Sequence, residues 1–224
     1  MVMPLKDYSH YFSMLSSPER AVAPKQLFYE GDFSLMTDGL RVSVIGSRNV
    51  SEKGIKRTKL ITKELVSRNI IIVSGLADGV DSIAHKTAIE MGGKTIAVLG
   101  TPLDKCYPSK NKGLLSEIKK NHLAISQFKP GSRVFTSNFP LRNKTMALIS
   151  EATLIIEATE KSGTRHQAKE AIRLGRTLFL MENLVRNNDL KWPLELLNYG
   201  AIVLTQGNYK SVFDKLHSFS FVAV

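Results

Sequence analysis

Short apolar runs alternate with longer amphipathic segments from residue 41 onward, and this alternation restricts the fold more than any other feature of the sequence. Continuous runs of four or five apolar residues are typical of strands covered on both faces. When helices separate such strands, the chain forms repeated βα units around a parallel sheet. We therefore expect an α/β fold, with a doubly wound, mostly parallel sheet and helices on both faces. The predicted strands are 42–45, 70–73, 95–99, 123–126, 153–156, 177–180 and 201–204, and the predicted helices are 52–68, 80–91, 111–121, 141–151, 163–174 and 192–197.

This core is predicted to form one domain, residues 41–206, with a segment on either side of it. Residues 1–40 are interpreted as an N-terminal extension packed on the core, because Pro18 and Pro24 interrupt any long helix and residues 26–29 are typical of a short strand. Residues 207–224 are predicted to hold a short helix, 210–217, and an apolar tail, 219–224, that packs on the domain or on a neighbour.

The charge balance predicts an anionic partner. Lys and Arg number 31 against 20 Asp and Glu, so the net charge is +11. Nucleic acid is the first candidate for such a partner, before an anionic membrane surface or a phosphorylated small molecule.

With 43% hydrophobic and 23% charged residues, the chain is neither disordered nor a membrane bundle. Cys106 is the single cysteine, and neither a signal peptide nor a membrane span is apparent, so we expect a cytoplasmic protein without a membrane partner.

The residues that follow the strands are the candidates for a site, because ligands of open parallel sheets bind beyond the carboxyl ends of the strands. Gly46, Ser47 and Arg48 follow the first predicted strand and open a helix. Backbone N–H groups at a helix N-terminus, together with an arginine, suit a phosphate group. The alternative interpretation of this segment is a tight turn with an exposed arginine.

The second predicted strand is followed by Ser74, Gly75 and Gly79, with Asp81 at the start of the next helix. This glycine-containing turn is predicted to line a ligand pocket, and Asp81 either caps the helix or holds the loop. His85 lies one helical turn after Asp81 and is expected on the same face. The two side chains therefore form either an acid–base pair or a structural pair.

Three further turns carry candidate binding residues. The loop after the third strand holds Gly100, Tyr107, Lys110 and Lys112, and cations beside an aromatic ring are typical of single-stranded nucleic-acid sites, although a solvated loop also explains the lysines. Later turns offer cationic, amide and small side chains, namely Arg142, Asn143, Ser162, Gly163 and Thr164. Common dehydrogenase, hydrolase and zinc motifs are absent from the sequence, so we predict neither catalytic residues nor a metal or cofactor.

Taken in order, these segments resemble the DNA-processing protein A family, also called DprA or Smf. The resemblance extends over about residues 17–206 and implies a Rossmann-like core. It rests on five motifs in the expected order: Gly46-Ser47-Arg48; Ser74-Gly75 with Gly79-Val80-Asp81 and Ala84-His85; Leu99-Gly100 with Leu103-Asp104, Tyr107-Pro108 and Asn111; Phe139-Pro140 with Arg142-Asn143; and Glu157-Ala158 with Ser162-Gly163.

The resemblance implies a non-catalytic protein that binds single-stranded DNA, protects incoming DNA during natural transformation and helps to load the RecA recombinase. It also implies a homodimer. Arg48 is then the foremost DNA contact, followed by Lys110, Lys112 and Arg142, with Tyr107 or Phe139 as a platform for a base. Gly46, Ser47 and Asn143 complete the predicted DNA-binding set.

The sequence departs from the family pattern at several positions. Pro102 replaces a glycine, Gln127 replaces an acidic residue, and 164–167 differ from the usual apolar continuation. No winged-helix module follows the core, so we expect any function of that module to be missing.

The core is also similar to LOG-type phosphoribohydrolases and nucleotide-sensing relatives, but Gln167 stands where their catalytic glutamate would be. A third interpretation is a partner-binding protein whose positive charge is only a solvated surface.

Overall fold

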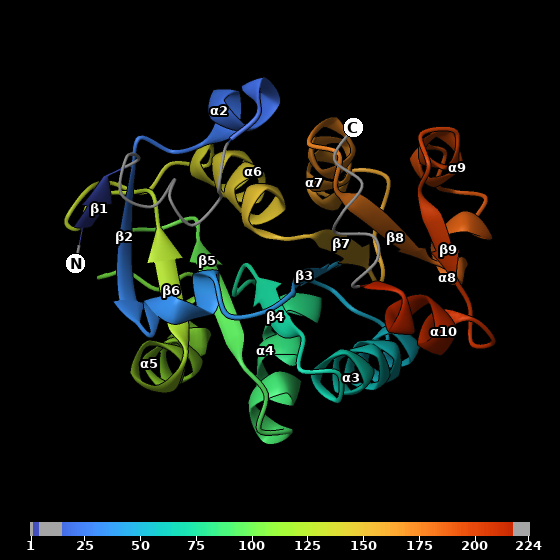
Figure 1. Ribbon diagram of the computed structural model, residues 1–224, viewed down its shortest axis with the longest axis horizontal. Helices are drawn as coiled ribbons and strands as arrows, with labels where there is room; N and C mark the ends of the chain where they lie inside the picture. The colour runs from blue at the N-terminus through green and yellow to red at the C-terminus, as the bar shows by residue number, and fades with distance from the viewer. Residues whose placement is uncertain (1, 5–14, 217–224) are drawn as a thin grey trace.

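The computed structural model describes residues 2–4 and 15–216, and within them one sheet of nine strands runs through the molecule (Figure 1). The strand order is β1-β2-β6-β5-β4-β3-β7-β8-β9. The strands are β1 (Val2–Pro4), β2 (Gln26–Gly31), β3 (Arg41–Ile45), β4 (Ile71–Ser74), β5 (Thr95–Leu99), β6 (Leu123–Ser126), β7 (Ala152–Ile155), β8 (Thr177–Met181) and β9 (Ile202–Leu204).

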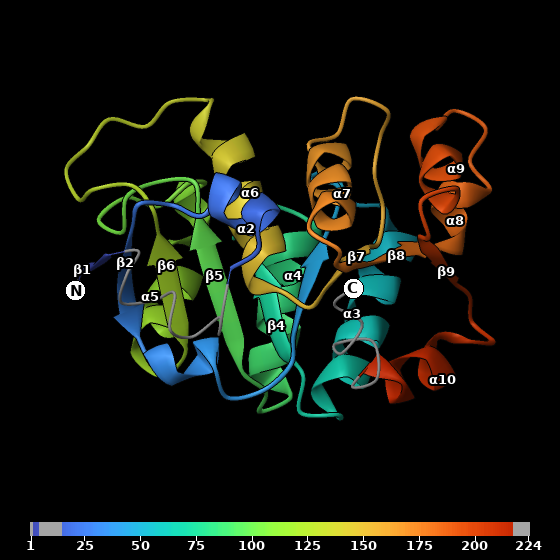
Figure 2. The ribbon, with the colours of Figure 1, turned by 45° about the horizontal axis from the view of Figure 1, so that its top comes forward.

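Seven of these strands, β3 to β9, are parallel to one another, and the chain changes direction across the sheet at β3. From β3 the chain adds β4, β5 and β6 on one side, and then returns to place β7, β8 and β9 on the other. The loops after β3 and β7 therefore lie side by side at the carboxyl edge, which is the topological switch point of the sheet. In Figure 2 the arrowheads of β3 and β5 point toward this edge.

Helices cover both faces of the sheet (Figures 1 and 2). On one face, apolar side chains of α3, α4 and α10 pack on the central strands, and α5 packs on β5 and β6. On the other face lie α6, α7 and α9. The helices are α2 (Ser17–Val22), α3 (Glu52–Val66), α4 (Val80–Glu90), α5 (Lys112–Asn121), α6 (Asn138–Ile149), α7 (Thr164–Arg173), α8 (Glu182–Val185), α9 (Trp192–Leu197) and α10 (Tyr209–Asp214), with 3-10 turns at η2 (Phe33–Met36) and η3 (Ser109–Asn111).

The predicted fold class is confirmed: the sheet is mostly parallel, doubly wound and covered on both faces. Each of the seven predicted core strands lies within one residue of its observed bounds. One helix region differs, because α6 begins at Asn138 and ends at Ile149, whereas 141–151 was expected. It ends early because Ser150 is extended and the Glu151 carboxylate accepts the Arg41 backbone N–H (2.6 Å) and pairs with the Arg41 guanidinium.

The described part of the N-terminal extension joins the sheet. β2 pairs with β6 in antiparallel orientation, from Phe28 opposite Ser126 to Gly31 opposite Leu123, and β1 pairs with β2. Leu27 is fully buried in this strand. The predicted C-terminal helix corresponds to α10, and the apolar tail 219–224 lies outside the described residues. A helix long and apolar enough to cross a membrane is absent from residues 2–4 and 15–216.

Candidate functional site

The loop between β3 and α3 forms the centre of the carboxyl edge. Gly46 is required there, because a Cβ atom would lie 2.6 Å from a Val80 methyl carbon and 2.8 Å from the Glu157 carbonyl oxygen. The Ser47 N–H donates to that same Glu157 carbonyl (2.7 Å), and the Ser47 hydroxyl donates to the Asn49 carbonyl (2.8 Å). These contacts fix the loop and leave the side chain of the next residue, Arg48, exposed to solvent.

A side-chain contact joins the β3–α3 loop to the loop after β7. The Glu157 carboxylate accepts the Ser51 backbone N–H (2.9 Å) and the Ser51 hydroxyl (2.6 Å). The Ser51 hydroxyl oxygen also accepts the Gly54 N–H (3.0 Å), and so caps α3. We call this arrangement the Ser51–Glu157 contact. Sequence reasoning noticed Glu157 within a motif but missed this role, because its partner is 106 residues away.

The loop between β4 and α4 packs directly against the β3–α3 loop. Gly79 has a φ of +70°, and a Cβ atom on it would lie 2.2 Å from the Ser47 carbonyl oxygen. The neighbouring Val80 N–H donates to the same carbonyl (3.2 Å). Only glycine allows the two backbones to approach this closely. Gly79 thus allows the β4–α4 loop to pack closely against the β3–α3 loop of the site.

Two buried residues of opposite charge, Asp81 and Arg142, form the floor of the site. Arg142 is only 5% exposed, and its Nη1 atom donates to the Gly75 carbonyl and to the Val98 carbonyl (3.0 Å). Asp81 accepts the Gly75 N–H (3.1 Å). Burial raises the pKa of Asp81 and lowers the pKa of Arg142, whereas the attraction between the two charges opposes both shifts. The two side chains therefore hold the ends of β4 and β5 together.

His85 and Asp81 bond to different residues and not to each other. The ring of His85 is fully buried, and its Nδ1 atom lies 2.7 Å from the Thr95 hydroxyl, while Asp81 bonds to Gly75. Burial lowers the pKa of His85 to about 3, with smaller contributions from the nearby His122 and Arg142. His85 is thus a neutral group of the core and lies behind the site.

Two aromatic rings and an arginine form one wall. The Arg48 guanidinium carbon lies 5.7 Å from the centre of the Phe139 ring, within the range of a cation–π contact. The Tyr107 ring lies on Phe139 with centres 5.6 Å apart and planes tilted by 56°. Tyr107 is 55% exposed, and Gly100 lets the Phe139 ring approach its backbone, since a Cβ would lie 2.6 Å from that ring.

A cavity of about 660 Å³ lies between this wall and the start of α7. At its far side the Ser162 hydroxyl oxygen accepts the Thr164 N–H (3.2 Å), and Asn143 donates to the Gly163 carbonyl (3.4 Å). Gln167 is fully buried at the cavity, and its amide has no hydrogen-bond partner among the described residues. Nine of the predicted residues line the cavity: Gly46, Ser47, Arg48, Asp81, Arg142, Asn143, Ser162, Gly163 and Thr164.

Other predicted residues lie beside the cavity or support it. Tyr107 and Gly75 line a small adjoining recess, with Arg48, Phe139 and Arg142. Lys110 is exposed and pairs with Asp78 (3.1 Å), and Lys112 is exposed at the first turn of α5; neither lines the cavity or its recess. Ser74, Gly79 and Gly100 are structural, because the Ser74 hydroxyl donates to the Val44 carbonyl (2.7 Å) and the two glycines allow close packing.

The cavity also contains residues that sequence reasoning did not assign to it. Asn49, Lys161 and His166 line it, together with Gln167. Lys161 and His166 flank the predicted Ser162–Thr164 segment, so their proximity in sequence was the available signal. Among the described residues, no group of three His, Cys, Asp or Glu side chains is placed to hold a metal ion. The donors at this site are N–H groups, amides and cations, which suit oxyanions.

The fold and this cavity define a Rossmann-type α/β protein with a cationic, aromatic-walled site at the switch point of its sheet. Residues 3–216 match the family model described as DNA recombination-mediator protein A, and the chain belongs to this family. The DNA processing protein DprA of Streptococcus pneumoniae is 36% identical over 89% of this chain and 68% of its own length. Protein Smf of Escherichia coli is 32% identical over 82% of this chain and 49% of its own length.

Solved structures agree with this assignment. DprA from Streptococcus pneumoniae superposes with a TM-score of 0.80 at 32% identity, over 92% of this chain and 71% of that chain. DNA processing protein A from Helicobacter pylori, whose structure describes a single-stranded DNA binding mode, gives 0.79 at 28% identity, over 92% of this chain and 94% of that chain. A molybdenum cofactor carrier protein from Chlamydomonas reinhardtii, at 16% identity and a TM-score of 0.55, shares the fold, covering 80% of this chain and 99% of that chain.

Proposed function

We propose that this protein binds single-stranded DNA in the cavity at the switch point. The observation that carries the proposal is the position of Arg48, which is exposed at the rim of the cavity and lies over the Phe139 ring. A guanidinium for the phosphate and an aromatic ring for the base are the two elements that single-strand sites combine. The single-stranded DNA binding mode of the Helicobacter pylori relative supports the same ligand.

The residues divide the work between contact and support. Arg48 and Lys161 supply positive charge for phosphates. Tyr107, which is exposed, offers its ring to a base, whereas Phe139 packs between it and Arg48. Arg142 positions the loops by holding the Gly75 and Val98 carbonyls. Recognition through phosphates and ring stacking predicts little sequence preference and a strong dependence on salt.

The wider part of the proposal concerns the role of the bound strand. The protein protects DNA in the cytoplasm during DNA uptake or recombination, assists loading of the RecA recombinase, and acts as a homodimer without catalysis. Family membership supports a role in DNA processing. Gln167 supports binding over hydrolysis at this site, because an amide has no titratable proton for acid–base catalysis.

The test is a titration of a fluorescent single-stranded oligonucleotide at several salt concentrations, beside a duplex of equal length. We expect Arg48→Ala to weaken single-strand binding about tenfold or more, because it removes both a phosphate contact and the cation over Phe139. Lys120→Ala, an exposed cation at the end of α5, is the matched control and should change affinity less than about twofold. Equal effects of the two substitutions, or no preference for the single strand, contradict the proposal.

A further inference from the structure

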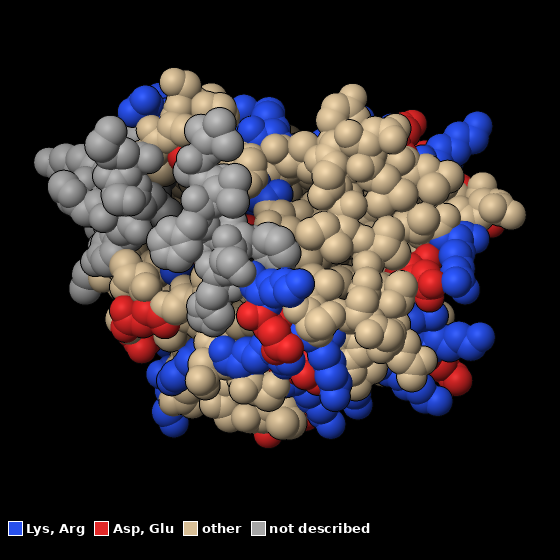
Figure 3. Space-filling view, turned by 45° about the vertical axis from the view of Figure 1, so that its right-hand side comes forward, with Lys and Arg blue, Asp and Glu red and all other residues tan. Residues whose placement is uncertain are grey.

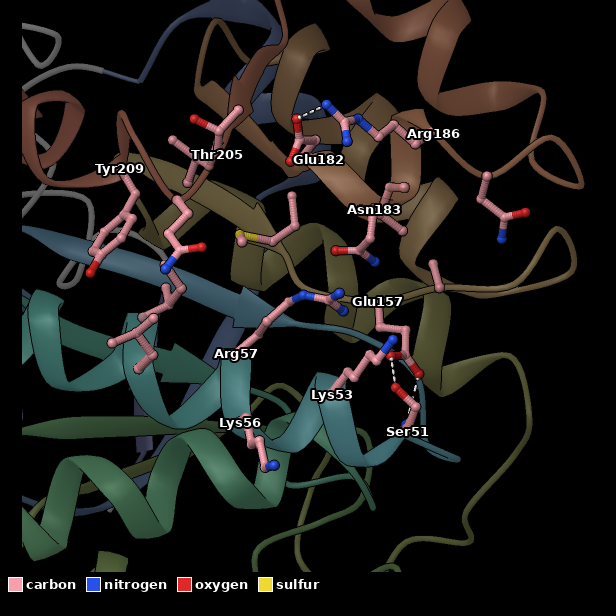
Figure 4. Close-up of a pocket in the computed structure, with 18 of the residues that line it drawn as sticks. Ser51, Lys53, Lys56, Arg57, Glu157, Glu182, Asn183, Arg186, Thr205 and Tyr209 are labelled. Carbon is pink, nitrogen blue, oxygen red and sulfur yellow. Dashed lines mark hydrogen bonds and ion pairs between the residues drawn. The ribbon is translucent and has the colours of Figure 1, made fainter.

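A second and larger cavity, of about 930 Å³, lies beside the first at the carboxyl edge of the sheet. It is bounded by α3, by the loop after β7 and by the segments that follow β8 and β9 (Figure 4). No predicted site residue lies in it, because the sequence carries no recognisable motif after these two strands. Figure 3 shows the molecule from this side, and most of the Lys and Arg side chains in this view lie in its lower half.

The cavity is lined by more cations than carboxylates. Lys53, Lys56, Arg57 and Arg186 line it, against Glu157 and Glu182. Both carboxylates have partners, since Glu157 accepts from Ser51 and Glu182 pairs with Arg186 (2.7 Å).

The cations of α3 have no such partners. Within the part of the chain that the structure describes, Lys53, Lys56 and Arg57 have no hydrogen-bond or ion-pair partner. Figure 4 shows Lys53 and Arg57 rising from α3 toward the loop that holds Glu157. Two unpaired cations directed into a cavity favour an anionic ligand there.

The remaining lining suits the rest of a nucleotide. Asn183 is directed into the cavity from the side opposite α3, and its buried Oδ1 atom has no donor among the described residues (Figure 4). Its Nδ2 atom donates to the Ile156 carbonyl (3.2 Å), which fixes the orientation of the amide. Leu60, which is 45% exposed, and Met181 add apolar surface for a base or a sugar.

The two cavities are neighbours that share both loops of the switch point. Ser47 to Asn49 line the first cavity and Ser51 lines the second; Thr159 lines the first, and Glu157 and Ala158 line the second. The Ser51–Glu157 contact therefore forms the ridge between them. An extended strand that leaves the first cavity needs only to cross this ridge to reach Lys53 and Arg57.

We propose that the second cavity binds a phosphodiester of the same DNA strand, with Lys53 and Arg57 as the contacts. This inference rests on the proposed function of the first cavity and extends it from a pocket to a continuous track. A free nucleotide carries the same phosphate chemistry, so the experiment must distinguish the two sources.

The experiment compares two oligothymidylates, of about four and about twelve nucleotides, by fluorescence anisotropy at several salt concentrations. The variant is the double substitution Lys53→Ala and Arg57→Ala. The matched control is Lys59→Ala with Lys63→Ala, which removes the same charge from exposed positions of the same helix that do not line the cavity. Circular dichroism verifies that both variants are folded.

We expect the Lys53/Arg57 variant to bind the short strand within about twofold of wild type, because that strand fills only the first cavity. The longer strand should bind about tenfold more weakly, and the slope of log affinity against log salt should fall by about 1.4, or about 0.7 for each lost contact. The control should weaken the longer strand less than about threefold. Equal losses in the two variants, or an unchanged longer strand in the Lys53/Arg57 variant, overturn the proposal.

Two further arms separate this inference from the proposed function. If wild type binds neither strand, the proposed function itself has failed, whereas short-strand binding that depends on Arg48 but not on Lys53 or Arg57 upholds it alone. The second arm titrates thymidine 5′-monophosphate. Binding of this nucleotide that requires Lys53 and Arg57, with no effect of either residue on the longer strand, assigns the cavity to a free nucleotide and overturns the strand proposal.

Discussion

Arg48 and Arg142 have the same side chain at the same edge of the sheet, but their surroundings give them different tasks. Arg48 is exposed over Phe139, whereas Arg142 is 5% exposed and donates to two carbonyls. The motif pattern placed both at the ends of strands and predicted both as DNA contacts. It cannot distinguish them, because the burial of Arg142 depends on Gly75 and Val98, which are distant in sequence. The edge of the sheet where the two arginines lie was thus predictable, but which of them is buried was not.

Substitution of Arg142 should therefore act first on stability. We expect Arg142→Ala to lower the free energy of unfolding by about 3 to 5 kcal/mol, because it leaves the buried Asp81 without its cation and two buried carbonyls without a donor. Arg48→Ala should change stability by less than about 0.5 kcal/mol, since its side chain is exposed. Urea unfolding measures both values. Equal stability of the two variants would show that Arg142 is not a structural residue.

His85 should make the folded protein sensitive to acid. Its pKa is about 3 in the folded protein, against 6.5 for an imidazole in water, so between these pH values the unfolded chain binds a proton that the folded chain does not. Stability is therefore complete above pH 6.5 and falls by up to about 1.4 kcal/mol per pH unit as the pH decreases toward 3. His122, whose pKa burial also lowers, contributes in the same direction.

The measurement is the free energy of unfolding by urea between pH 7 and about pH 4.5. His85→Gln should give a flatter pH dependence than wild type, whatever its effect at pH 7. The exposed His166→Gln is the control and should keep the wild-type slope. A slope that is unchanged in His85→Gln assigns the acid sensitivity to other groups.

At the scale of elements, local sequence defined the pieces and left their arrangement open. The apolar runs located seven core strands, and Asn, Gly and Ser residues marked the ends of helices such as α4 and α7. The short α8, which has only four residues, has no periodicity to detect. The antiparallel pairing of β2 with β6 was also not predicted, because it joins segments that lie almost 100 residues apart and depends on tertiary packing.

Gly79 is the position where one element constrains another most closely. We expect Gly79→Ala to lower stability by at least about 2 kcal/mol and to weaken single-strand binding, because a Cβ would press on the Ser47 carbonyl in a backbone conformation, φ +70° and ψ −125°, that favours glycine. Thermal unfolding and oligonucleotide titration measure the two effects.

Gly92 provides the control for this prediction. It has the same φ of +70°, but a Cβ on it would have no atom within 4 Å. Gly92→Ala should therefore lower stability by only about 1 kcal/mol and leave DNA binding unchanged. Weaker binding in Gly92→Ala would show that loss of stability alone, and not the position of the Ser47 loop, reduces affinity.

Across the whole molecule the sheet is continuous from β1 to β9, so distant ends should unfold together. Leu27 is fully buried in β2, and the single tryptophan, Trp192, is fully buried in α9 near the opposite edge. We expect Leu27→Ala to lower stability by about 2 to 5 kcal/mol and to shift the Trp192 fluorescence transition as far as the circular dichroism transition. Lys25→Ala, at an exposed position beside β2, should shift neither.

Separate transitions in the two signals would instead identify the N-terminal segment as an independent unit. The same measurement therefore tests the predicted division into extension and core. Because β2 pairs with β6 over four residues, the structure favours a single transition.

The switch point also sets the order in which the site is completed as the chain is made. Its two loops, after β3 and after β7, are separated by about a hundred residues and meet only when β7 pairs with β3. A nascent chain that has emerged from the ribosome as far as β6 has the Arg48 loop but neither Glu157 nor the start of α7. The cavity is thus completed only after about 150 residues of this sequence have been translated, and its completion coincides with closure of the core.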